Sequence, residues 1–117
     1  AYAATLIARH SRILGVHLND GYAKRDDGLM VGSVHPIQTI ELLYVLDRIG
    51  YKGCIYFDTF PDTTGLDPVS ECETNIGSVQ AMRRVVDRLK NNKFLAAAIQ
   101  KQDAVASQAI VQAALYG

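Results

Sequence analysis

Three things are scarce in this sequence: cysteine, net charge and long apolar runs. Its two cysteines, Cys54 and Cys72, show neither a paired zinc spacing nor a Cys-x-x-Cys redox motif, which favours reduced thiols over a disulfide. Twelve Lys and Arg residues balance twelve Asp and Glu residues, which argues against nucleic acid or an anionic membrane as the main partner. The longest apolar run, Phe94 to Ile99, is far shorter than the roughly 18 residues of a spanning helix, and no signal-peptide pattern is present. These absences predict a soluble, cytoplasmic protein.

The sequence does contain enough apolar residues for a buried core. Of its 117 residues, 49% are apolar and 21% are charged, close to the averages of globular proteins. The length matches the most common domain size, about 100 to 150 residues, and falls below the roughly 250 residues of a closed eight-fold β/α barrel. The chain opens at Ala1 within a helical pattern and without an initiating Met. We therefore expect one compact unit or a piece of a larger protein.

Hydrophobic periodicity predicts a strand–loop–helix unit that is used twice. The expected helices cover residues 1–10, 36–50, 75–90 and 94–115. The expected strands cover residues 13–19 and 52–58, which are apolar on both faces and end in a polar residue. Residues 61–70 are rich in Pro, Thr, Gly and Asp and are predicted to form a loop. Strands joined through helices pair in parallel, so we predict a parallel α/β sheet with helical crossovers.

A polar residue lies at the end of each predicted strand. Alternation along an extended chain places His17 on one face of the first strand and Asp58 on one face of the second. Ligands bind at the carboxyl ends of strands in α/β proteins, so we expect the two residues to share a site. A histidine nitrogen and an aspartate oxygen suit a divalent ion such as manganese, cobalt or zinc. The residues alone leave a structural, hydrogen-bonded His17 and a paired Asp58 as open alternatives.

The loop after the first predicted strand is rich in acidic residues. Asp20, Asp26 and Asp27 could together hold a hard cation, because carboxylate oxygens favour such ions. The alternative is an ordinary solvated turn in which Lys24 and Arg25 neutralise the acids. Spacing does not decide between a metal site and a solvated turn.

The rest of the chain offers no second catalytic motif. The glycines of residues 28–33 do not have the arrangement of a dinucleotide fingerprint or a P-loop, which argues against nucleotide binding. No Gly-x-Ser-x-Gly elbow is present, and neither cysteine has an obvious activating base, so covalent acyl chemistry has no support. His35 directly precedes Pro36 and is expected to be a helix cap or a loop residue.

Three motifs together resemble a known family. They are Gly15–Asp20 (GVHLND), Lys24–Asp27 (KRDD) with Gly32-Ser33 beyond it, and Phe57–Pro61 (FDTFP). These motifs are similar to the last two β/α units of the xylose-isomerase-like TIM barrels, and most of all to L-rhamnose isomerases and related sugar isomerases. The resemblance implies that residues 1–90 are the C-terminal β/α units of a (β/α)8 barrel. It further implies that residues 91–117 are a C-terminal helical extension, which such enzymes use for subunit contacts.

The resemblance also implies a role for individual acidic and histidine residues. His17 resembles the metal ligand on the seventh strand of the family, and Asp58 resembles the ligand on the eighth strand. Asp26 and Asp27 resemble an acidic pair that holds a second, catalytic metal ion or its water. The family commonly spaces this pair by one residue, whereas Asp26 and Asp27 are adjacent, so Asp20 could substitute for one of them.

The implied activity is the interconversion of an aldose and a ketose by a metal-assisted hydride shift. The cofactor would be a divalent metal, Mn, Co, Mg or Zn, with two ions in the full-length enzyme, and Lys24 would contact the sugar substrate. The ligands on the fifth and sixth strands have no counterpart here, so these 117 residues would be inactive alone. The full-length form would be a homo-oligomer. Two alternatives remain: a ketose epimerase or sugar-phosphate isomerase of the same superfamily, and a non-catalytic α/β binding module.

Overall fold

The computed structural model describes residues 1–61 and 65–117 and contains both helices and strands. Its helices are α1 (Tyr2–His10), α2 (Pro36–Arg48), α4 (Pro68–Lys90), α5 (Lys93–Gln100) and α6 (Ala104–Tyr116). Its strands are β1 (Val16–Leu18) and β2 (Ile55–Phe57), which pair in parallel with His17 opposite Tyr56. The order of these elements and the parallel pairing agree with the pattern in the sequence.

The expected fold class, part of a (β/α)8 barrel, is wrong. The described residues form five helices and one two-stranded sheet, and they contain no barrel. The apolar runs at 13–19 and 52–58 predicted long strands, but each strand is three residues long. A strand extends only where a neighbour satisfies its backbone groups, and each strand here has a single neighbour. Leu14 therefore lies before the paired segment and is 85% exposed, although its apolar run predicted burial.

The two-stranded sheet is covered on one face only. Leu18 is buried in the core, and Val16 and Phe57 pack against that core, which is built largely from α2 and α4. The opposite face carries His17 and Tyr56, and Tyr56 is 63% exposed. Parallel sheets in proteins usually have both faces covered. This uncovered face, which we call the open face of the sheet, is therefore the unusual feature of the fold.

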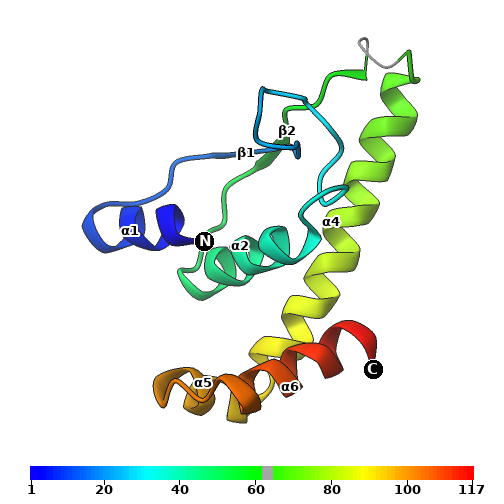
Figure 1. Ribbon diagram of the computed structural model, residues 1–117. Helices are drawn as coiled ribbons and strands as arrows, with labels where there is room; N and C mark the ends of the chain where they lie inside the picture. The colour runs from blue at the N-terminus through cyan, green and yellow to red at the C-terminus, as the bar shows by residue number, and fades with distance from the viewer. Residues whose placement is uncertain (62–64) are drawn as a thin grey trace.

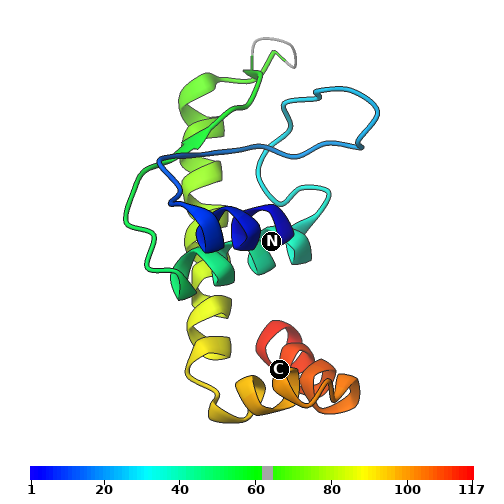
Figure 2. The same cartoon turned by 90° about the vertical axis from the view of Figure 1, so that its left-hand side faces the viewer.

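Helix α4 runs the length of the molecule. In Figure 1 its first half lies beside the sheet and α2, and its last turns reach α5 and α6. The perpendicular view in Figure 2 shows the same separation between the sheet and the two C-terminal helices. The radius of gyration is 15.4 Å, larger than the roughly 13 Å of a compact domain of this length. The chain is thus elongated along α4.

The boundaries of α2 and α4 follow their capping residues. Pro36 begins α2, and Gly50, with a φ of 72°, follows its end, as the sequence indicated. Helix α4 begins at Pro68 rather than at residue 75, because the Asp67 side chain accepts a hydrogen bond from the Ser70 N–H and caps the helix. The loop predicted at 61–70 is therefore too long, and its residues 62–64 lie outside the described residues.

The single helix predicted at 94–115 is two helices in the structure. Between α5 and α6, Gln102 has a φ of 55°, and the Asp103 side chain caps α6 by accepting a hydrogen bond from the Ala106 N–H. An Ala-rich pattern does not reveal such a break. The Arg88 guanidinium of α4 donates hydrogen bonds of 3.0 and 2.7 Å to the Ala114 carbonyl, which fastens α6 to α4.

We expect Gly28→Ala to lower the free energy of unfolding by about 2 to 4 kcal/mol. Gly28 has a φ of 58°, which disfavours any side chain, and an added Cβ would overlap the Phe60 ring. Gly77→Ala is the matched control, because Gly77 lies within α4 and an added Cβ meets nothing within 4 Å. It should raise stability by about 0.5 to 1 kcal/mol. Urea unfolding followed by circular dichroism measures both, and equal effects would contradict this account of Gly28.

Candidate functional site

The carboxyl ends of β1 and β2 lie side by side, and their polar residues lie on the open face of the sheet. The rings of His17 and Tyr56 are in contact, with centroids 4.9 Å apart. The Asp58 N–H donates a hydrogen bond of 2.9 Å to the Leu18 carbonyl, so the backbone pairing of the two segments continues one residue past β2. Because side chains alternate along an extended chain, Asp58 follows Tyr56 onto the face that carries His17. The pairing therefore predicts that both candidate metal ligands lie on one face.

Asn19 connects this strand end to the acidic loop. Its side-chain amide donates a hydrogen bond of 2.9 Å to the Asp58 carbonyl and one of 3.1 Å to Asp26 Oδ1. Asp26 itself is exposed. The bridge therefore brings Asp26, the first member of the predicted acidic pair, next to the end of β2. The Asp58 carboxylate forms no hydrogen bond with residues 1–61 or 65–117.

Asp27, the second member of the pair, is engaged within its own loop. Its Oδ2 accepts a hydrogen bond of 3.0 Å from the Tyr22 N–H, and its Oδ1 accepts one of 2.9 Å from the Arg25 guanidinium. The Tyr22 N–H and then Arg25 hold the pKa of Asp27 below its usual value. These contacts match the solvated-turn alternative, with Arg25 as the neutralising cation. Lys24, the predicted substrate contact, is exposed and forms no ion pair within the described residues.

Asp20 has a structural role that spacing did not indicate. It is only 7% exposed, and its Oδ2 accepts hydrogen bonds of 2.8 and 2.7 Å from the backbone N–H groups of Val34 and His35. Its Oδ1 accepts a bond of 2.9 Å from the Gly21 N–H and lies 2.8 Å from the His35 ring nitrogen Nδ1. Asp20 therefore joins the two ends of the segment that links β1 to α2, and both its oxygens are used for this purpose.

The same contacts determine the protonation of Asp20. Burial raises its pKa, but the hydrogen bonds from the His35 backbone and ring, the Val34 N–H and the Gly21 N–H oppose burial and lower it to about 2. His35 occupies the N-cap position of α2, in line with its expected role, although its ring contacts Asp20 instead of capping the helix. Asp20 stays ionised throughout the neutral range.

Helix α4 carries two buried polar residues, Glu71 and Asn75, that the sequence pattern did not single out. The Asn75 side chain is fully buried, accepts a hydrogen bond of 2.9 Å from the Val31 N–H, and lies 3.5 Å from the Thr59 hydroxyl. Glu71 is buried one turn earlier, and its Oε1 has no hydrogen-bond partner among the described residues. Both extend the apolar stripe of α4 at i, i+4 spacing from Val79, which is the signal that could have found them. Through its bond to Val31, Asn75 thus holds the segment between β1 and α2 against α4.

The described residues provide only part of a metal site. Structural and catalytic metal ions usually have at least three protein donors. Within residues 1–61 and 65–117, no three His, Cys, Asp or Glu side chains gather closely enough to hold a metal ion. His17 and Asp58 fit as two donors of a suitable kind, while Asp20 and Asp27 are engaged elsewhere. A metal ion at the open face would have His17 and Asp58 as its protein donors among the described residues, and water or other groups would complete its coordination.

Comparisons with known proteins do not add to this description. No protein-family model matches the chain, and no curated protein matches it. None of the helices in the described part of the chain combines the length and the apolar content that a membrane crossing requires. The resemblance to sugar isomerases stays a prediction that rests on the three short motifs.

Proposed function

We propose that this chain supplies two metal ligands, His17 and Asp58, to a divalent-metal-dependent enzyme that interconverts an aldose and a ketose. One observation supports the proposal: β1 and β2 pair in parallel, with His17 in the paired register and the Asp58 N–H bonded to the Leu18 carbonyl, so the two candidate ligands lie at adjacent strand ends. The motifs around both residues support it. The proposal concerns these donors alone and does not involve the barrel fold that the structure contradicts.

Each residue of the site has a defined task under this proposal. The His17 imidazole and the Asp58 carboxylate bind the ion, which is Mn, Co, Mg or Zn. Asn19 positions the end of β2 and Asp26 through its two hydrogen bonds. Asp26 and Asp27 would hold a second ion or its water, although Asp27 is paired with Arg25 in this structure. When bound, the metal supplies polarisation of the sugar hydroxyl and carbonyl oxygens.

A binding experiment on the chain itself tests the metal ligands. We expect Mn²⁺ to broaden the NMR amide signals of His17, Asn19 and Asp58 most strongly, because relaxation by a paramagnetic ion falls steeply with distance. The variants His17→Ala and Asp58→Asn should each weaken this binding at least tenfold. His10→Ala is the control, since His10 lies on α1 and is exposed. Broadening that survives both site variants, or that centres elsewhere, would contradict the proposal.

The reaction class has a separate test on the full-length protein. With a C2-deuterated aldose, a hydride shift retains the label in the ketose, and we expect retention. Complete loss of label to solvent would instead indicate proton transfer, as in the alternative of a ketose epimerase or sugar-phosphate isomerase. Absence of any sugar conversion while Mn²⁺ binding persists would leave the metal site standing and overturn the isomerase activity.

A non-catalytic binding module is the second candidate function. The observation that favours it is the lack of a three-donor cluster among the described residues, together with the internal pairing of Asp27. In that case the open face of the sheet serves to bind another polypeptide. His17→Ala and Asp58→Asn would then leave metal content and thermal stability unchanged.

A further inference from the structure

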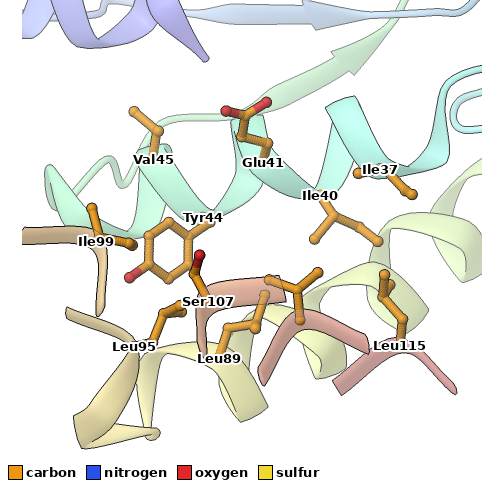
Figure 3. A pocket seen from close by; sticks show the side chains of 11 residues that line it. Ile37, Ile40, Glu41, Tyr44, Val45, Leu89, Leu95, Ile99, Ser107 and Leu115 are labelled. Atoms are coloured by element: carbon orange, nitrogen blue, oxygen red, sulfur yellow. The ribbon is translucent and has the colours of Figure 1, made fainter. Parts of the chain in front are cut away.

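A second site lies at the other end of the molecule, between α2 and the C-terminal helices. A cavity of about 360 Å³ separates α2 from α5 and α6, and α4 closes its inner side with Leu89. Figure 3 shows Ile40 and Tyr44 of α2 pointing across the space toward Leu95 and Ser107. Eight of the eleven lining residues are Ile, Leu or Val. The cavity is independent of the sheet and of the function proposed above.

Both walls of the cavity pack against α4. Helix α2 packs along the middle of α4, while α6 is fastened near its end by the two hydrogen bonds from Arg88 to the Ala114 carbonyl. Leu89 and Leu95 are buried at the base, and Tyr44 is half-buried in the α2 wall. An apolar space of this kind is unfavourable when filled by water, because its walls offer water few hydrogen bonds.

We propose that this cavity binds an uncharged amphiphile: a molecule with an aliphatic chain and a hydroxyl or carbonyl head. The volume falls within the range of about 300 to 1,000 Å³ that small-molecule sites occupy. It is more than twice the roughly 150 Å³ of a dry apolar cavity that holds benzene. The lining of Ile, Leu and Val side chains suits the aliphatic chain.

The polar groups of the cavity select the head. Ser107 donates its hydroxyl hydrogen to the Asp103 carbonyl at 2.8 Å, so its oxygen is available as an acceptor. The Tyr44 hydroxyl forms no hydrogen bond with any described residue and can donate one. Either group can bond a hydroxyl head, which donates to the Ser107 oxygen or accepts from the Tyr44 hydroxyl.

Charge argues against an acidic ligand. Glu41 is the one charged residue of the lining, and Figure 3 shows its carboxylate on the opposite side of the α2 ribbon from Tyr44. No Lys, Arg or His lines the cavity; Arg48 lies over the Tyr44 ring, 5.9 Å from its centroid, outside the lining. A buried carboxylate without a cation is costly. A fatty acid should therefore bind more weakly than the corresponding alcohol.

Displacement of the neutral dye Nile red tests the size and charge of the ligand. We expect n-octanol to displace the dye, and we expect octanoate at neutral pH to bind at least tenfold more weakly than n-octanol. Tyr44→Phe should weaken the binding of n-octanol about threefold to tenfold and leave the binding of Nile red unchanged. Equal displacement by the alcohol and the acid, or no dye binding at all, would overturn the proposal.

Cavity-filling variants locate the binding. Val111→Trp fills the space from α6 and should reduce n-octanol binding at least tenfold, whereas Val105→Trp should not, because Val105 is 82% exposed on the same helix and does not line the cavity. Ile99→Trp on α5 is a second filling variant, for use if Val111→Trp lowers the helix content. Sedimentation is run in parallel. Dye binding that follows the formation of dimers would assign the cavity to an interface between copies and overturn the proposal.

Discussion

The Asp20→Ala variant should lose about 3 to 5 kcal/mol of unfolding free energy. Asp20 is the acceptor for three backbone N–H groups and lies within hydrogen-bond distance of the His35 ring. Alanine leaves the N–H groups of Val34 and His35 without their acceptor at a part-buried position. Because small domains are stable by only about 5 to 15 kcal/mol, a loss of this size is a large share of the total.

Urea unfolding at pH 7 measures this loss, and Asp26→Ala is its matched control. Asp26 lies in the same segment but is exposed and accepts one hydrogen bond, from Asn19. Its removal should cost about 0.5 kcal/mol or less. If the two variants lost similar stability, the buried contacts of Asp20 would not be the cause.

The pH dependence of stability gives an independent test of Asp20. Its pKa is about 2 in the folded chain and 3.8 as its ordinary value. At pH values between these two, the unfolded chain binds more protons than the folded chain, so stability rises with pH. The contribution of Asp20, about 2 kcal/mol, is complete above about pH 5 and is lost as the pH falls toward 2. Wild-type protein should therefore lose more stability over this interval than Asp20→Asn does.

The Asn75→Ala variant should be destabilised by about 2 to 4 kcal/mol. Asn75 has no exposed surface, and its Oδ1 is the acceptor for the Val31 N–H. Alanine removes that acceptor and also leaves a small cavity beside α4. Since Val31 is itself buried, water has little access to its N–H.

Two measurements distinguish this effect from a general loss of helix. Thermal or urea unfolding gives the stability, with Asn91→Ala as control because Asn91 is exposed at the end of α4 and its side chain makes no hydrogen bond with the described residues. Hydrogen exchange then reports on the Val31 amide, which should exchange faster in Asn75→Ala. An unchanged exchange rate at Val31 would contradict the role given to Asn75.

The sequence allowed the elements near capping residues to be predicted, but not the extent of the sheet. Pro36 and Gly50 act through their own backbone preferences, so local pattern was sufficient for α2. The length of a strand depends instead on hydrogen bonds from neighbours far away in the sequence. Apolar runs around Ile13 and Cys54 therefore predicted more strand than forms, and the barrel that the resemblance of the motifs implied is absent from the described residues.

Only part of the candidate site could be predicted from the sequence. Alternation along a strand is local, so a common face for His17 and Asp58 could be predicted from the sequence, and this placement stays a prediction. The state of the acids did not, because Asp20, Asp26 and Asp27 have the same chemistry and differ only in which donors the fold brings to them. Asn75 was missed because an amide within a helix becomes informative only when its burial is known.

The shortness of β1 and β2 has a consequence for the behaviour of the molecule in concentrated solution. Within the part of the chain that the structure describes, each strand has one edge without a β partner, and unpaired edges are templates on which other chains assemble into aggregates. A long flat edge offers many consecutive backbone groups to a passing chain, whereas three residues offer very few. The sheet that is too short to be strong is thus also too short to act as an efficient seed for fibrils.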